Sequence, residues 1–301
     1  MSSLVFIDLN KSKISDSSMQ AATIANELDN DVYGLTTSKD DEYISSLGNN
    51  GFDKIFKIDD FNNIDAIKET IINHKINTIV SSNTNLFKEV VSQISIKLNF
   101  TILSNVLEII DNNKIISSIF TGKAETQLRV DNENRIFLIN KNIIDSKKFD
   151  KVVDIISIDS KISQNNNFEI IEQTLIEEDI SLNDADIVIS AGRGLKSPEN
   201  WKMIDELAKK LNAATACSKP VSDAGWRPHH EHVGQTGLKI SPKIYFAIGI
   251  SGAIQHLAGV NSSKTIVVIN NDPDAPFFKA ADYGVVGDAF EVVPKIIDSL
   301  S

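Results

Sequence analysis

Polar side chains suited to holding a cofactor follow two apolar stretches in the last third of the chain. Ser218 and Lys219 come directly after one stretch, and Gln235 and Thr236 lie in the loop behind them. The second stretch, residues 244–250, ends in a Ser-Gly turn that precedes the helical pattern AIQHLAG. The free N–H groups at such a helix start, together with the helix dipole, suit a phosphate. The sequence therefore predicts a cofactor pocket.

The elements that would position these residues alternate between strand and helix. Strands are predicted at 186–190, 213–217, 244–250, 265–270 and 283–286, and helices at 198–211, 252–258 and 289–300. Such alternation is typical of a doubly wound α/β sheet, in which ligands bind outside the carboxyl ends of the strands. Each predicted strand has a polar or charged candidate at its end: Arg193, Ser218, Ser251, Asn270 and Asp288.

The first half of the chain predicts a second α/β domain without a site of its own. Strands near 3–9, 31–37, 55–58 and 78–82 alternate with helical patterns at 17–28, 62–73 and 85–98. From residue 103 the pattern changes to short segments between polar turns, which predicts a hairpin-rich edge. We find no phosphate loop or catalytic cluster before residue 165, so we interpret residues 1–165 as a scaffold and interface domain and residues 166–301 as the cofactor-binding domain.

Composition excludes several classes of protein. The 301 residues carry a formal charge of −11, which argues against binding to nucleic acid or to an anionic membrane surface. The single cysteine, Cys217, excludes a disulfide framework and a cysteine-ligated cluster within the chain. No stretch approaches the roughly 18 to 20 apolar residues of a membrane span. The N-terminus lacks the pattern of a secretory signal, so we expect a cytoplasmic protein, or a mitochondrial matrix protein if an organellar form is processed.

Four blocks of the second half carry a family resemblance. GRGLKSPENW (192–201), SKPVSDAGWRPHHEHVGQTG (218–237), GISGAIQHLAG (249–259) and INNDPDAPFFKAADYGVVGD (269–288) resemble the C-terminal domain of the electron transfer flavoprotein alpha subunit. The resemblance implies non-covalently bound FAD and a heterodimer with a beta subunit. It also implies an electron carrier rather than an enzyme. Such a carrier moves electrons from flavin dehydrogenases of the acyl-CoA dehydrogenase type, as in fatty acid beta-oxidation, toward a quinone oxidoreductase.

The resemblance also assigns residues to the FAD. It implies that Arg193 contacts the cofactor, that Thr236 reaches the flavin nitrogen protonated on reduction, and that His256 lies at the ring carbonyls, where partial positive charge stabilises reduced flavin. Lys219 departs from the family, which usually has an arginine stacked over the ring. The full set of predicted cofactor-binding residues is Arg193, Ser218, Lys219, Val233, Gly234, Gln235, Thr236, Ser251, Gly252, Ala253, Ile254, Gln255, His256, Asn270, Asp288 and Ala289.

Simpler readings of these residues stay open from sequence alone. Asn270 and Asp288 could cap the helices that follow them, and a lone helical histidine such as His256 is usually structural. The histidines of residues 229–232 lie in a proline-containing loop where no helix aligns them, so we expect no metal site. Two other functions also remain: an NAD- or FAD-dependent enzyme with a base beside the cofactor, and an adenine-nucleotide-binding regulatory protein without redox activity.

Overall fold

The chain forms two compact units, Met1–Thr174 and Leu175–Ser301. The computed structural model describes residues 2–10, 13–111, 113–120, 124–158, 180–182 and 185–300. The predicted domain boundary near residue 165 lies outside the described residues and stays a prediction. Each unit is described by itself below.

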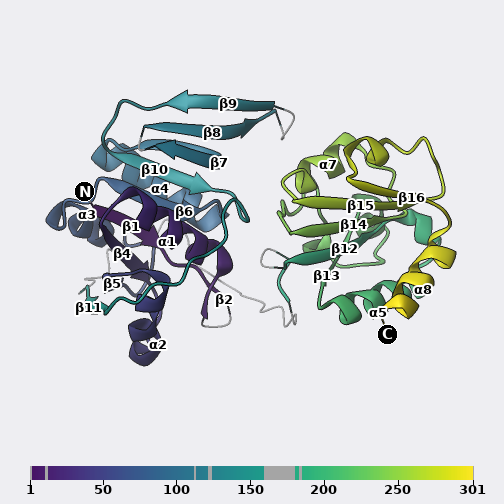
Figure 1. The fold of residues 1–301 in the computed structure, drawn as a ribbon, viewed down its shortest axis with the longest axis horizontal. Coiled ribbons are helices and arrows are strands. Elements are labelled where there is room, and N and C mark those ends of the chain that lie inside the picture. The colour runs from purple at the N-terminus through teal and green to yellow at the C-terminus, as the bar shows by residue number, and fades with distance from the viewer. Residues whose placement is uncertain are drawn as a thin grey trace. The chain divides into compact units, whose positions relative to one another are not determined.

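The N-terminal unit is built on a nine-stranded sheet of order β11-β5-β4-β1-β6-β10-β7-β8-β9 (Figure 1). The strands from β11 to β7 run parallel, and β8 and β9 extend β7 as antiparallel strands. The strands are β1 (Ser2–Phe6), β4 (Asp31–Thr36), β5 (Lys54–Lys57), β6 (Thr78–Ser82), β7 (Thr101–Asp111), β8 (Lys114–Ile119), β9 (Ala124–Arg129), β10 (Arg135–Ile139) and β11 (Asp154–Ser157), and a two-stranded ribbon adds β2 (Leu9–Asn10) and β3 (Lys13–Ile14).

Helices cover both faces of this sheet because its central strands are apolar on both faces. Leu4 and Phe6 pack with α3 (Ile64–Asn73) and α4 (Asn85–Leu98), whereas Val5 packs with α1 (Asp16–Leu28). A shorter helix, α2 (Asp41–Ser46), and the 3-10 turn η1 (Leu47–Asn50) complete the second layer. Alternate residues of one strand thus enter two separate cores, as in a buried parallel sheet.

Two strands of the N-terminal unit lie where the sequence pattern did not place them. The segment RIFLI was predicted as part of a hairpin-rich edge, but as β10 it is a central parallel strand between β6 and β7. All five of its residues are buried, and after Arg135 they form the apolar run IFLI, which is typical of a strand covered on both faces. The short β11 pairs with β5 at the opposite edge. The predicted hairpin edge is therefore confined to β7, β8 and β9.

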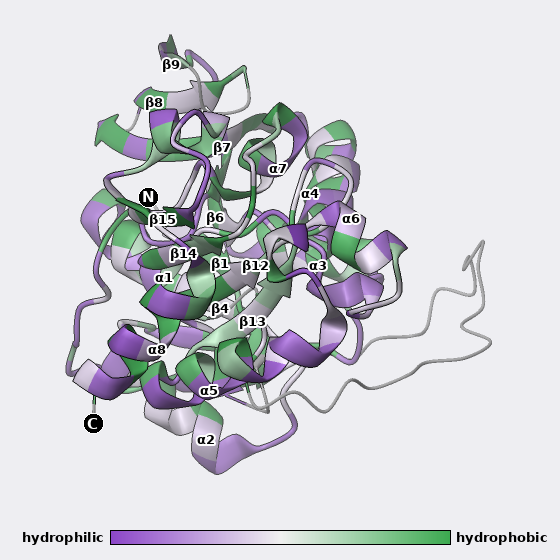
Figure 2. Ribbon diagram, turned by 90° about the vertical axis from the view of Figure 1, so that its right-hand side faces the viewer, coloured by the Kyte–Doolittle hydropathy of each residue, from purple (hydrophilic) through white to green (hydrophobic). Residues whose placement is uncertain are grey.

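The C-terminal unit is a doubly wound, five-stranded parallel sheet of order β13-β12-β14-β15-β16. This architecture agrees with the predicted fold class. Its strands are β12 (Ile187–Ala191), β13 (Ala214–Cys217), β14 (Ile244–Ile248), β15 (Thr265–Asn270) and β16 (Tyr283–Val286). Helices α5 (Lys202–Leu211) and α8 (Ala289–Ser299) pack on one face and α7 (Ile254–Val260) on the other (Figure 1). Both α5 and α8 carry hydrophobic and hydrophilic residues along their length (Figure 2), as helices between core and solvent do.

Short helical turns join these elements at the carboxyl edge of the sheet. They are η2 (Arg193–Leu195), η3 (Pro198–Trp201), α6 (Lys219–Asp223), η4 (His229–Glu231) and η5 (Pro276–Ala280). The sequence pattern did not predict α6, although Pro220 stands in its first turn, where a proline is well tolerated.

The strand order reverses between β12 and β14, and the loops that follow these two strands touch through glycines. Gly194 N donates to Gly249 O at 3.1 Å, and Gly192 N donates to Ile248 O at 2.9 Å. A Cβ atom on Gly194 would lie 2.6 Å from Gly249 Cα, and Gly249 has a φ of +60°. Only glycine tolerates both requirements without a shift of the backbone. This reversal is the position at which doubly wound sheets open a crevice for ligands.

We expect Gly194→Ala to lower the free energy of unfolding of the C-terminal unit by about 1 to 3 kcal/mol, because the new methyl group meets backbone that has no room to yield. Urea denaturation followed by tryptophan fluorescence reports on this unit, since both tryptophans, Trp201 and Trp226, belong to it. Gly287→Ala is the control, because its Cβ would meet only side-chain atoms, of Val292 and Val285. Equal stability of the two variants would contradict the packing argument.

Candidate cofactor-binding site

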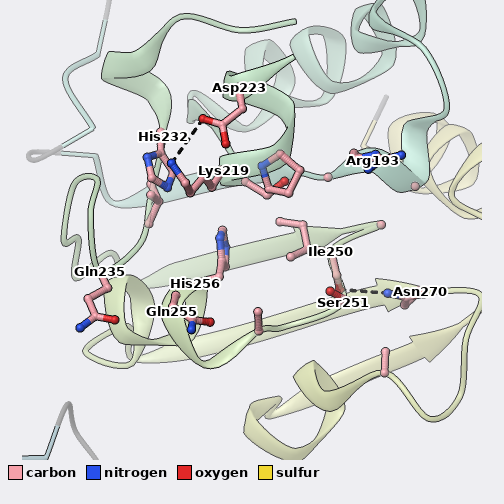
Figure 3. A pocket seen from close by; sticks show the side chains of 18 of the residues that line it. Arg193, Lys219, Asp223, His232, Gln235, Ile250, Ser251, Gln255, His256 and Asn270 are labelled. Carbon is pink, nitrogen blue, oxygen red and sulfur yellow. Dashed lines mark hydrogen bonds and ion pairs between the residues drawn. The ribbon is translucent and has the colours of Figure 1, made fainter. Parts of the chain in front are cut away.

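A cavity of about 920 Å³ opens at the carboxyl edge of the C-terminal sheet. Its volume lies near the upper end of ligand sites, which span about 300 to 1,000 Å³. Loops after four strands and the turn at residues 232–236 line it (Figure 3). The cavity brings together eleven of the sixteen predicted residues, namely Arg193, Ser218, Lys219, Val233, Gln235, Thr236, Ser251, Ala253, Gln255, His256 and Asn270.

The other five predicted residues do not line the cavity. Asp288 Oδ1 accepts a hydrogen bond from Phe290 N at 2.9 Å, so this residue caps α8, and its carboxylate pairs with Lys196 at 3.7 Å. Ala289 is the first residue of α8 and is buried in the core, and Ile254 is exposed and does not line the cavity. Gly234 and Gly252 instead allow close approach or an unusual conformation of the backbone. A Cβ on Gly259 would lie 2.5 Å from Gly234 N, and Gly252 has a φ of +85° beside Phe277. A role for these five toward a cofactor stays a prediction.

The long loop between β13 and β14 folds back onto both β13 and α7. Val233 N donates to Cys217 O at 3.1 Å, which ties the loop to the end of β13. Gln235 N donates to Gln255 O at 2.7 Å, which sets the Gln-Thr-Gly turn against the first turn of α7 (Figure 3). These two bonds explain how residues about twenty positions apart in the sequence come to line one cavity.

An ion pair that the sequence analysis did not predict stabilises the same loop. Arg227 Nε donates to Glu231 Oε2 at 2.7 Å, and Arg227 Nη2 donates to Glu231 Oε1. The Glu231 side chain is only 5% exposed, and the guanidinium lies 5.3 Å from the centre of the Trp201 ring. A bidentate pair this buried resists breaking, because loss of one partner costs about 3 to 5 kcal/mol. The spacing of four residues in WRPHHE was the available signal, although the residues lie in a loop.

Charged side chains at the mouth of the cavity include one ion pair. Lys219 Nζ lies 3.3 Å from Asp223 Oδ1 across one turn of α6 (Figure 3), and Arg193 is exposed on η2. Asp223 and Asp272 line the cavity although the sequence analysis did not select them. His232 lies next to this pair, and burial, with a smaller effect of the Lys219 charge, lowers its pKa below the usual value. The mouth therefore carries cations whose charge is partly balanced by carboxylates.

His256 is a buried titratable residue that lines the cavity. The residue is 7% exposed, and its Nε2 atom lies 2.8 Å from the hydroxyl of the fully buried Tyr245. Burial, and to a smaller extent His232, lowers the pKa of His256 to about 4. The ring is therefore neutral near pH 7, so it can offer only the dipole of an N–H group rather than a full positive charge. Its Nδ1 atom is buried and has no hydrogen-bond partner within the described part of the chain.

Asn270 and Cys217 both have structural environments that limit their chemistry. The Asn270 amide donates to Ile250 O at 2.9 Å and accepts from Asp272 N at 3.0 Å, so it ties together the loops after β14 and β15. Burial, with a smaller contribution from Glu231, raises the pKa of the Cys217 thiol to about 12, and the thiol stays protonated.

Among the described residues, no group of three or more His, Cys, Asp or Glu side chains could hold a metal ion. No helix within the same ranges has the length and apolarity to cross a membrane.

Comparisons with known proteins point to one family. Residues 181–261 match the family model described as the electron transfer flavoprotein FAD-binding domain. The chain is 36% identical over 213 residues to the electron transfer flavoprotein subunit alpha of Paracoccus denitrificans, a match that covers 71% of this chain and 69% of that protein. It is 35% identical over 233 residues to the mitochondrial subunit alpha of Arabidopsis thaliana, covering 74% of this chain and 64% of that protein. Over 121 residues it is 51% identical to the subunit alpha of Thermoanaerobacterium thermosaccharolyticum, covering 40% and 37%. The chain thus spans roughly two thirds of the first two relatives, and less of the third.

The pKa of His256 predicts how stability depends on pH. Because the folded-state pKa of about 4 lies below the ordinary value of 6.5, folding favours the neutral ring. The corresponding stability is complete above pH 6.5 and is lost as the pH falls toward 4, by at most about 3 kcal/mol. We expect His256→Gln to have a shallower pH dependence than the parent chain in urea titrations read by tryptophan fluorescence. Burial also lowers the pKa of His74, but this residue lies in the other unit, so His74→Gln should keep the parent's dependence in the tryptophan signal, which comes from the C-terminal unit. Parallel curves for parent and His256→Gln would refute the assignment.

Proposed function

The chain belongs to the family of electron transfer flavoprotein alpha subunits, and on that premise we propose that it binds FAD at the cavity of its C-terminal unit and carries electrons between other flavoproteins. Its partner in this proposal is a beta subunit, with which it forms a heterodimer. The electrons come from flavin dehydrogenases of the acyl-CoA dehydrogenase type and pass to a quinone oxidoreductase. The observation that carries the proposal is the gathering of the family's motif residues at one cavity on the carboxyl edge of the sheet.

The residues of the cavity fit FAD in three ways. The glycines at 192, 194 and 249 line the cavity with backbone alone, which a ligand can approach closely. The side chains of Arg193 and Lys219 line the cavity and supply cations for the pyrophosphate. The unpartnered Nδ1 of His256 is a buried polar atom that a bound ring would satisfy. Bound FAD supplies reversible one- and two-electron chemistry, and this chain's own groups would hold and tune it.

The enzyme alternative has less support. The pair closest to a nucleophile and base near the cavity is Ser222 and His229, whose Oγ and Nδ1 atoms lie 2.8 Å apart. Ser222 is only 4% exposed and does not line the cavity, so it is poorly placed to attack a substrate. Cys217 is held as a thiol. Electron transfer needs neither nucleophile nor base, which is why we favour the carrier.

The test of this proposal is the absorption spectrum of the chain co-expressed with its beta subunit. We expect a flavin band that is released on denaturation and bleached by dithionite. A colourless complex that takes up no added FAD would overturn the proposal and favour the adenine-nucleotide-binding alternative. A coloured complex that turns over a substrate by itself, without an electron acceptor protein, would favour the enzyme alternative.

Thr236 supplies a second test, because in this proposal its hydroxyl donates to the flavin nitrogen that is protonated on reduction. Thr236→Ala should lower the midpoint potential by about 30 to 60 mV for the two-electron couple. A hydrogen bond to a charged group is worth about 1.5 to 3 kcal/mol, and about 30 mV corresponds to 1.4 kcal/mol. Spectroelectrochemical titration measures the shift, with Thr265→Ala on β15, outside the cavity, as the control. An unchanged potential in Thr236→Ala would remove this role.

A further inference from the structure

A buried hydrogen bond lies directly behind the cavity. Tyr245 on β14 is 0% exposed, and its hydroxyl lies 2.8 Å from His256 Nε2. Phe277 packs against both rings, with its centre 6.3 Å from that of Tyr245 and 5.8 Å from that of His256. Tyr245 itself does not line the cavity, whereas His256 does (Figure 3). Any effect of Tyr245 on a ligand must therefore pass through the imidazole.

The direction of this hydrogen bond follows from the protonation states. Burial raises the pKa of the Tyr245 phenol, so the phenol keeps its proton at neutral pH. Burial lowers the pKa of His256, so the imidazole carries one proton on one of its two nitrogens. A buried phenol that donates to Nε2 satisfies both groups, whereas an N–H at Nε2 would turn the phenol proton toward the Ser190 hydroxyl, the other polar group that acts on the phenol. The bond therefore favours the tautomer that carries its proton on Nδ1.

The other nitrogen of the ring has no partner. Nδ1 is buried and makes no hydrogen bond within the described part of the chain, although the residue lines the cavity. An unsatisfied N–H in an apolar environment is costly, so its persistence in a folded protein calls for an explanation. A ligand that brings an acceptor, such as a ring carbonyl, would complete the group. Without the Tyr245 bond, either nitrogen could carry the proton, and the donor would be only partly present.

We propose that Tyr245 is a positioning residue that locks His256 in the Nδ1–H tautomer, so that a single hydrogen-bond donor faces the bound cofactor. This inference rests on the proposed function, because it names FAD as the ligand that receives the donor. A fixed N–H dipole stabilises electron density that the ring gains on reduction. Tyr245 would then influence the reduction of the cofactor without touching it.

The first measurement is the tautomer itself, in the full chain with its beta subunit and [15N]histidine. With five histidines in the chain, His256→Gln identifies the signals of His256. At pH 7, with and without FAD, we expect the shifts of a protonated Nδ1 and an unprotonated Nε2. Protonated Nε2 in the parent chain overturns the inference, and it does so without reliance on any variant of Tyr245.

The second measurement uses Tyr245→Phe, which keeps the aromatic ring and removes only the hydroxyl. We expect a mixture of tautomers, and roughly a threefold to tenfold loss of preference for reduced over oxidised FAD, seen as a lower midpoint potential. Ser190→Ala is the matched control, because the Ser190 hydroxyl on β12 also acts on the phenol but is not expected to set the tautomer. If Ser190→Ala shifts the tautomer as Tyr245→Phe does, the Tyr245 hydroxyl does not set the tautomer by itself and the inference fails.

The outcomes separate this inference from the proposed function. A parent complex that takes up no FAD overturns both. A parent complex that binds FAD, with either protonated Nε2 or an unchanged potential in Tyr245→Phe, overturns the inference alone. Bound FAD, protonated Nδ1 and a lower potential in Tyr245→Phe support both.

Discussion

The site depends on one close backbone contact, between Gly194 and Gly249 at the point where the strand order reverses. Because neither residue has a side chain, the loops after β12 and β14 meet directly and leave the crevice above them open. That contact places Arg193 on one side of the cavity and Ser251 on the other. The loops after β13 and β15 complete the lining of the cavity, and the loop after β13 is tied to Cys217 and to Gln255. A side chain at either glycine would push apart the loops that carry the site.

Two buried polar pairs fix the geometry of the site, one near the loop and one deeper in the core. The Arg227–Glu231 pair holds the loop against the layer of α5, at the cost of taking a carboxylate almost completely out of water. The Tyr245–His256 pair sits deeper and orients a side chain rather than a loop. Apolar packing alone would place both segments approximately, because it has no preferred direction. Hydrogen bonds between buried groups restrict both the geometry and the protonation state of each partner.

Much of this organisation could be predicted from the sequence, because the strands of a doubly wound sheet are recognisable as apolar runs and their carboxyl ends lie at one edge of the sheet. Arg193, Ser218 and Ser251 were found in this way. Pairing between distant segments could not be predicted, so β10 was assigned to a hairpin edge rather than to the centre of a parallel sheet. Burial cannot be read from the sequence either, so the sequence could not show that the His256 ring is neutral and that any partial positive charge it offers is that of an N–H dipole. Asp223 was missed because the helix α6 that presents it has only five residues.

The position of β10 has a consequence for how the chain folds as it leaves the ribosome. The centre of the N-terminal sheet stays open until residues 135–139 have been made, because β10 enters between β6 and β7. The edge strand β5 stays unpaired on one side for longer still, until β11, about a hundred residues later in the chain, has been made. Such long-range closures are slow, and unpaired strand edges are prone to aggregate in the interval. The nascent chain should therefore need protection by chaperones until β11 has emerged. By contrast, the strands described for the later unit all come from residues 187–286, so its sheet can close by itself.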